Sequence, residues 1–145
     1  MSKELEGLET HGNLKKAFIE EAGTMLRYLY FAKIADFEGF DETAAVFRDL
    51  AEGGHNNVHG NLDFLEAVGD PLTALPIGGT ARNVEAAFSA ETFEFNELYP
   101  RMADMARKEG FTDIASWFES LAKLKRSHVA RFKAMKLKQD SGSSS

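Results

Sequence analysis

The stretch that most constrains the fold is the amphipathic run from Ile114 to Met135. Its apolar residues recur with the 4-3 spacing of one α-helical face, at Ile114, Phe118, Leu121, Phe132 and Met135. Two positions in the same register, Lys125 and His128, are polar. Because charged side chains are almost never fully buried without a partner, this run predicts a helix whose inner face meets anionic groups from other helices.

Composition narrows the class of protein. A chain of 145 residues, of which 43% are hydrophobic, is long enough for one domain with its own core. The net charge of -6, with Lys and Arg dispersed, argues against nucleic acid and anionic membranes as partners. The absence of cysteine excludes disulfides and a four-cysteine iron centre. The first residues lack an apolar leader and no run reaches membrane-spanning length, so we expect a cytoplasmic protein.

Two helices are expected in the first half of the chain. The first ends near Gly39 and its inward stripe contains one charge, Glu21, among Leu14, Phe18, Met25, Tyr28, Ala32 and Ala35. The second begins with Asp41 as N-cap, and its expected inward positions are Phe47, Leu50, Gly54, Asn57 and Asn61. The centre of this half is therefore expected to be small and polar.

The second half repeats this plan after a loop over residues 70–80 that is rich in proline and glycine. A third helix should run from about Ala81 to Gly110, kinked at Pro100, with Val84, Phe88, Glu91 and Phe95 facing inward. The fourth begins at Thr112 or Asp113. We expect an N-terminal extension over residues 1–12, one bundle over 13–139 and a flexible tail over 140–145.

The two halves resemble each other in sequence. The motif that begins at Asn13 and includes Glu21 recurs from Asn83 to Glu91. The segments after Gly39 recur after Gly110, and here the distance between the two copies is one residue longer. This residue must lie between Glu91 and Tyr99, the counterpart of Tyr28. A π-bulge is the easiest way for a helix to hold it, and would turn Glu94 inward. The repeat predicts an all-α bundle of two helical hairpins, joined by a long crossover and related by a pseudo-twofold axis.

The repeat also pairs positions at the centre: Glu21 with Glu91, Gly54 with Lys125, and Asn57 with His128. Bundles that bind two metals take a Glu from one helix of each half and a Glu-x-x-His from the other. The chain has these positions, but not all of the ligands.

Several motifs together resemble the rubrerythrins of the ferritin-like superfamily. They are Asn13-Leu14-Lys15-Lys16-Ala17-Phe18, Arg27-Tyr28-x-x-Phe31-Ala32, Glu38-Gly39-Phe40, Ala90-Glu91-Thr92-Phe93-Glu94, Tyr99-Pro100 and His128-x-x-Arg131-Phe132. The likeness covers roughly residues 13–132. It implies a ferritin-like four-helix bundle with two iron ions, which reduces hydrogen peroxide or reacts with oxygen.

The resemblance also implies site residues. Glu21, Glu91, Glu94 and His128 match metal ligands of the family, whereas Gly54, Asn57 and Lys125 stand where the family has glutamate, histidine and glutamate. Tyr28, Tyr99 and Asn61 would lie around the centre, with both phenols hydrogen-bonded to core carboxylates. We assign no catalytic residue.

Lys125 has two interpretations. Its long side chain could reach solvent, or its ammonium could replace the metal charge by binding Glu21 and Glu91. His128 is either a metal ligand or a core histidine with a satisfied hydrogen bond. Glycine at positions 53 and 54 predicts a small cavity beside Asn57. His55, His59 and Glu52 should lie outside the bundle.

Three functions remain open: a rubrerythrin-like protein with a degenerate metal site, an oxidoreductase acting on peroxide or oxygen, and a scaffold with a small-molecule cavity near Gly54. In the last, Lys125 would serve as an amine nucleophile of lowered pKa. For cofactors, we expect none or a single weakly bound metal, against the two iron ions that the resemblance implies. A homodimer is an open expectation, and nothing indicates the electron donor.

Overall fold

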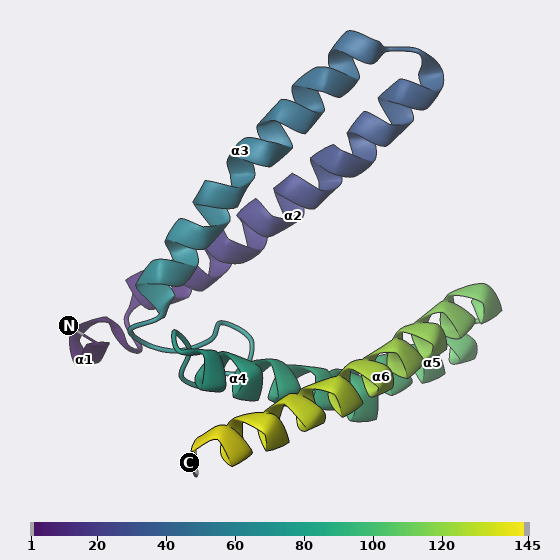
Figure 1. Ribbon diagram of the computed structural model, residues 1–145. Coiled ribbons are helices and arrows are strands. Elements are labelled where there is room, and N and C mark those ends of the chain that lie inside the picture. Colours follow the sequence, from purple (N-terminus) through teal and green to yellow (C-terminus); the bar gives the residue numbers. More distant parts are fainter. Residues whose placement is uncertain (1, 144–145) are drawn as a thin grey trace. The chain divides into compact units, whose positions relative to one another are not determined.

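The computed structural model describes the backbone of residues 2–143 and the side chains of residues 4–138. Its helices follow in the order α1 (Ser2–Leu5), α2 (Glu9–Glu38), α3 (Asp41–Leu65), α4 (Thr80–Phe93), η1 (Glu94–Leu98), α5 (Tyr99–Lys108) and α6 (Thr112–Ser143) (Figure 1). No strand occurs among the described residues, which confirms the all-α class. No helix in this part of the chain is long and apolar enough to cross a membrane.

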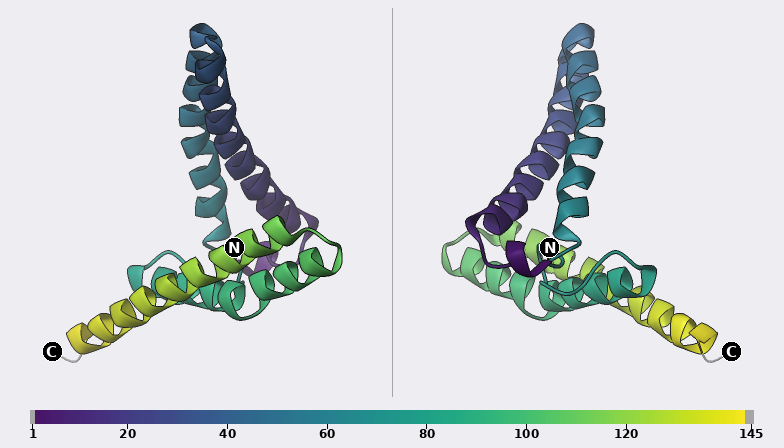
Figure 2. Two further views of the ribbon diagram at one scale, coloured as in Figure 1. Left: turned by 90° about the vertical axis from the view of Figure 1, so that its right-hand side faces the viewer. Right: turned by 90° about the vertical axis from the view of Figure 1, so that its left-hand side faces the viewer.

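The chain divides into two compact units, Met1–Pro71 and Leu72–Ser145. The first unit contains the hairpin of α2 and α3, and the second contains the hairpin in which α4, η1 and α5 run along α6. In each hairpin the paired helices lie side by side in both views of Figure 2. Each hairpin is therefore a packing unit with contacts of its own.

Both hairpins turn at a glycine in the left-handed conformation, as the sequence predicted. Gly39 has φ 87° and Gly110 has φ 89°, a region that L side chains adopt only with strain. The amide of Phe40 donates to the carbonyl of Ala35, and the amide of Phe111 donates to that of Ala106, both at 2.8 Å. These bonds satisfy the last carbonyls of α2 and α5 and place the next helix antiparallel to the one before it.

The prediction that Asp41 caps α3 is wrong by one residue. Phe40 is the N-cap and makes no side-chain capping bond, while Asp41 is the first helical residue. In the first turn its carboxylate still faces the positive end of the helix dipole, together with Glu42. Asp41 still marked the start of the helix correctly, because acidic residues are favourable both at the N-cap and in the first turn.

Small residues form the contact between α2 and α3. Ala32, Ala35 and Ala44 are buried in one cluster, and Phe47 packs against it. Further along α3 the buried positions are Ala51, Gly54, Val58 and Leu65. Of the expected inward positions on α3, Gly54 is buried within this hairpin, whereas Leu50 is 57% exposed and Asn57 is exposed too. Alanine and glycine face α2 because they let the two backbones approach closely.

The extra residue of the second hairpin lies in a π-helical turn, η1, between Glu91 and Tyr99. This confirms the prediction from the repeat. Pro100 follows in the first turn of α5. In place of the kink expected at Pro100, the helix contains a π turn just before the proline. Because Pro100 then lies in the first turn of α5, its missing amide hydrogen breaks no α-helical hydrogen bond.

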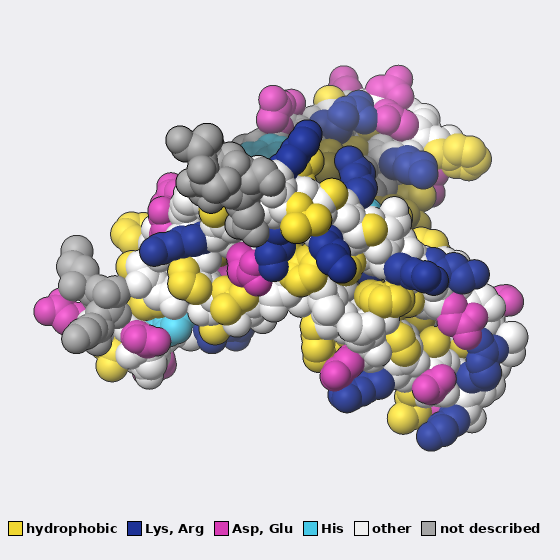
Figure 3. All heavy atoms as spheres, turned by 60° about the horizontal axis from the view of Figure 1, so that its bottom comes forward, with side chains coloured by type: hydrophobic (Ala, Val, Ile, Leu, Met, Phe, Trp, Pro, Cys, Tyr) yellow, Lys and Arg dark blue, Asp and Glu magenta, His cyan; other side chains and the backbone are white. Residues whose placement is uncertain are grey.

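The helix ends differ from the expected boundaries. α2 begins at Glu9, within the expected extension over residues 1–12. α6 continues to Ser143 and so includes most of the expected tail over residues 140–145, of which 144–145 lie outside the described residues. On the face shown in Figure 3, hydrophobic side chains lie among charged ones of both signs.

Candidate metal centre

The polar group at the centre of the second hairpin is the ammonium of Lys125. It extends from α6, and its Nζ lies 3.0 Å from Oε1 of Glu91 and 3.0 Å from Oε2 of Glu94. The side chain of Lys125 is 20% exposed, and those of Glu91 and Glu94 are 17% and 19% exposed. Lys125 therefore bridges two carboxylates instead of reaching solvent.

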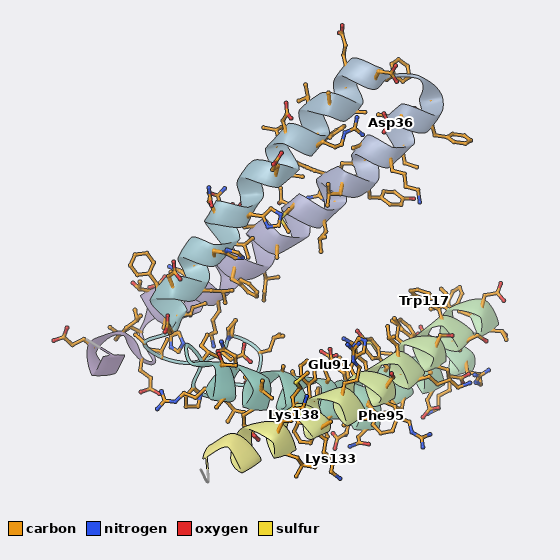
Figure 4. The ribbon with its side chains drawn as sticks, viewed as in Figure 1. Asp36, Glu91, Phe95, Trp117, Lys133 and Lys138 are labelled. Carbon is orange, nitrogen blue, oxygen red and sulfur yellow. The ribbon has the colours of Figure 1, made fainter. Side chains whose placement is uncertain are left out.

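Glu91 uses both of its oxygens in this cluster. While Oε1 binds Lys125, Oε2 lies 2.8 Å from Nδ1 of His128, one turn further along α6. Lys125 and His128 both reach Glu91 because positions i and i+3 share one face of a helix. Figure 4 labels Glu91 on α4, beside α6. His128 is thus hydrogen-bonded within the core, at the position where the resemblance implies a metal ligand.

Glu94 joins the cluster because of η1. It is the first residue of the π turn, and the turn brings its carboxylate to Lys125 on α6. Its Oε2 is buried and accepts no hydrogen bond of good geometry from the described residues, so the ion pair with Lys125 is what compensates this oxygen. The prediction that the extra residue turns Glu94 inward is confirmed.

The surroundings of Lys125 stabilise its charged form. Burial by itself would lower the pKa of Lys125, but the polar contacts and negative charges of Glu94 and Glu91 outweigh it, so the pKa lies above the ordinary 10.5. An amine nucleophile at neutral pH requires the opposite shift. The raised pKa therefore runs against the hypothesis that Lys125 acts as such a nucleophile.

In the first hairpin, Glu21 and Asn57 stand at the positions of Glu91 and His128. Nδ2 of Asn57 lies 3.5 Å from Oε2 of Glu21, at the outer limit of a hydrogen bond. Asn61 donates from Nδ2 to the carbonyl of Asn57 at 2.9 Å. The same two positions thus meet in both hairpins, but the contact in the first is longer and more exposed.

On the side that faces α2, the space beside Gly54 is occupied by Met25. A Cβ atom placed on Gly54 would lie 3.4 Å from Cβ and 3.5 Å from Cγ of Met25. Met25 on α2 therefore packs against the space that the glycine leaves on α3. Met25 was expected in the inward stripe of its helix but not opposite Gly54, because periodicity gives the face of a helix and not the partner across it.

Tyr28 and Tyr99 pack against equivalent aromatic residues. The ring of Tyr28 lies 5.5 Å from that of Phe47, and the ring of Tyr99 lies 6.4 Å from that of Phe118. Both tyrosines are half-buried. Their hydrogen bonds to core carboxylates stay a prediction.

Two ion pairs at the far ends of the hairpins were not anticipated. Arg48 donates to Asp36 at 2.6 Å between α3 and α2. In the second hairpin Arg107 pairs with Glu119 between α5 and α6. Each residue lies 71 positions after its counterpart, yet the signs of the charges are exchanged. Exchanged signs leave no shared residue type at these positions, so the sequence repeat does not reveal the pairs.

An open recess of about 370 Å³ adjoins the cluster. Glu91 and His128 line it together with Arg131, Phe132 and Met135. The polar cluster of the second hairpin thus borders a recess in that hairpin. Arg131 belongs to the motif His128-x-x-Arg131-Phe132, to which the sequence alone assigns no role beyond the resemblance.

The residues of the cluster do not fit a pair of iron ions as they stand. Metal-bound carboxylates need free lone pairs directed at the ion, whereas Glu91 and Glu94 direct oxygens at the ammonium of Lys125. Across the described residues, no group of three or more His, Asp or Glu side chains is arranged to hold a metal. Gly54 and Asn57 add no carboxylate or imidazole in the first hairpin.

Comparison with known proteins gives a consistent result. The family model "Rubrerythrin" matches residues 12–136. A rubrerythrin of Porphyromonas gingivalis is 36% identical over 99% of this chain and 74% of its own length. Rubrerythrins of Clostridium perfringens and Nitratidesulfovibrio vulgaris are both 34% identical over 90% of this chain, and over 71% and 70% of their own lengths.

These matches correct one expectation. From the missing ligands we expected no cofactor, or a single weakly bound metal. The family model and the relatives instead point to iron as the cofactor. Replaced ligand positions in one sequence do not establish that the metal itself is lost.

Proposed function

Because this chain belongs to the rubrerythrin family, we propose that it is a rubrerythrin-like protein with an altered di-metal site, in which Lys125 takes a ligand position and pairs with core glutamates. The observation that carries the proposal is the pair of 3.0 Å contacts from Nζ of Lys125 to Glu91 and Glu94. An ammonium there supplies positive charge to carboxylates that would otherwise repel each other in a half-buried setting.

Iron and Lys125 would compete for the same oxygens. The oxygens of Glu91 and Glu94 that lie 3.0 Å from Nζ are hard ligands of the kind that iron takes. His128 adds an imidazole that is now hydrogen-bonded to Glu91. The charge and the position of Lys125 should therefore control the metal affinity of the second hairpin.

Substitution of Lys125 tests the proposal. Lys125→Glu restores the residue type that the resemblance implies and removes the competing ammonium, so the variant should bind more ferrous iron per chain than the parent. Lys123→Glu, an exposed change two residues away on α6, is the control and should match the parent. Elemental analysis after anaerobic loading gives the comparison. Equal iron content in all three proteins would contradict the altered-site proposal.

An oxidoreductase acting on peroxide or oxygen is the second candidate. What favours it is that Glu91, Glu94 and His128, all of ligand-forming types, lie together in the second hairpin beside an open recess. Peroxide removal by the iron-loaded parent should then fall in Glu94→Gln and persist in Glu97→Gln, whose side chain is exposed. Equal rates in these two variants and in an iron-free sample would reject this candidate.

The internal duplication is part of the proposal. It is supported by the contacts Glu21 to Asn57 and Glu91 to His128, and by the ring pairs of Tyr28 and Tyr99, which recur at corresponding positions. A homodimer and a cytoplasmic location remain predictions.

A further inference from the structure

A second polar arrangement lies on the first hairpin, on α3. His55 and His59 are one helical turn apart, both exposed, with ring centroids 6.2 Å apart and the rings edge to face. Positions i and i+4 lie on the same face of a helix, about 6 Å apart at Cβ. Neither ring belongs to the contact with α2, which is made by Ala51, Gly54 and Val58. The two imidazoles are therefore free to turn toward each other.

From this geometry we propose that His55 and His59 form a surface site for a late first-row divalent metal ion, such as Zn²⁺, Ni²⁺ or Cu²⁺. Imidazole nitrogen suits these ions, which bind at about 2.0–2.1 Å. Closing two rings on one ion requires only side-chain rotation at exposed positions. Water would complete the coordination, because no group of three His, Asp or Glu side chains suited to a metal occurs among the described residues.

Acidic side chains continue the same face of α3. Glu52 precedes His55 by three positions and Asp63 follows His59 by four, so all four residues lie within one stripe of the helix. Both carboxylates are exposed. Their negative charges favour a cation at the histidine pair without being ligands themselves.

The position of the pair suggests what the metal would do. Gly53, Gly54 and Gly60 make this the part of α3 with the weakest helix propensity. A metal held by His55 and His59 spans one turn between these glycines and binds only while the turn is helical. Binding to the native state alone raises the free energy of unfolding with the logarithm of the metal concentration once that concentration exceeds the Kd. Metal binding at this site thus stabilises this turn of α3 reversibly.

Titration with Ni²⁺ and with Zn²⁺, followed by calorimetry and thermal melting, tests this inference. The parent should bind one ion per chain and melt at a higher temperature with metal. His55→Ala and His59→Ala should each lose at least about tenfold in affinity and lose the thermal shift. His11→Ala, which removes a histidine at the start of α2, should behave as the parent.

A register control separates chelation from histidine content. The double variant His59→Ala with Gly60→His keeps two histidines on α3 but moves one to the adjacent face, so it should bind as weakly as His59→Ala. Tight binding by this variant, or unchanged affinity in His55→Ala and His59→Ala, would overturn the inference. Metal held at the Lys125 cluster would survive all of these changes, so the outcome is independent of the function proposed above.

Discussion

Lys125 on α6 and Glu91 on α4 form an ion pair at 3.0 Å in which both side chains are four-fifths buried, with exposed fractions of 20% and 17%. Ion pairs on a protein surface contribute little to stability, but removing one partner from a buried pair leaves an uncompensated charge. The second hairpin should therefore depend on Lys125 far more than on its other lysines.

The substitution Lys125→Met tests this dependence. It keeps the length of the side chain but removes the charge, so Glu91 and Glu94 face each other without a cation. We expect the free energy of unfolding to fall by about 2–3 kcal/mol, somewhat below the range for fully buried pairs because the cluster is partly exposed. Urea unfolding at neutral pH measures the change.

Lys123→Met is the matched control, since Lys123 is exposed on the same helix and should change stability by less than about 0.5 kcal/mol. Equal loss in the two variants would mean that the ion pair contributes nothing beyond helix propensity.

The contribution of Lys125 to the free energy of unfolding should also depend on pH, and it should decrease at high pH. Its pKa is raised in the folded state by Glu94 and Glu91 against the opposing effect of burial. A group with a raised folded pKa contributes stability that is complete below the unfolded value of 10.5 and is lost as the pH rises through the folded value. The stability difference between the parent and Lys125→Met should therefore be constant from about pH 7 to about pH 9 and narrow above 10.5.

Unfolding curves of both proteins across this range, each compared with Lys123→Met at the same pH, would check the trend. A difference that narrows already between pH 7 and 9 would show that Lys125 loses its proton in the native state at much lower pH than its contacts indicate.

Alanine at Gly53 or Gly54 should stabilise α3. Replacing a mid-helix glycine gains roughly 0.5–1 kcal/mol. A Cβ at Gly53 meets open space, and one at Gly54 makes ordinary contact with Met25 at 3.4 Å. Both variants should melt at a higher temperature than the parent. A destabilised Gly54→Ala beside a stabilised Gly53→Ala would show that the contact with Met25 is less favourable than its 3.4 Å separation indicates.

Removal of one residue from η1 should be tolerated. Deleting Asn96, which is exposed, converts the π turn into regular α-helix and keeps the packing of Tyr99 on Phe118. Deleting Leu26, which is exposed on α2, rotates every later residue of α2 by about 100°. We expect cooperative melting from the first variant and not from the second. Loss of cooperativity in both would assign η1 a structural role of its own.

The elements of the fold were largely predictable because they depend on local signals. The 4-3 spacing of apolar residues predicted the helices, and glycine predicted both hairpin turns. The π turn at Glu94 was predicted because the distance between the two copies of the repeat grows by one residue. The boundaries were less accurate: the acidic signal at Asp41 does not distinguish a cap from a first turn, and the helix ends at Glu9 and Ser143 lie outside the expected range.

Those contacts of the site that follow from a buried charge were predictable, whereas those that depend on how side chains pack across two helices were not. A lysine in an apolar stripe demands carboxylates, which led to Glu91. Glu94 as its second partner, and Met25 against Gly54, depend on which side chains meet across two helices, and one sequence does not give this. The cofactor expectation was wrong because the replaced ligands at Gly54, Asn57 and Lys125 were given more weight than the two iron ions that the resemblance implies.

The ion pairs at the hairpin ends have a consequence for how such a chain could change by recombination. Asp36 pairs with Arg48, whereas the corresponding positions hold Arg107 and Glu119. A hybrid hairpin that combined α2 with α6 would bring Asp36 opposite Glu119, and one that combined α5 with α3 would bring Arg107 opposite Arg48. Exchange of a whole hairpin keeps every pair intact. The two halves can therefore be inherited as blocks, while crossovers between their single helices are penalised by like charges.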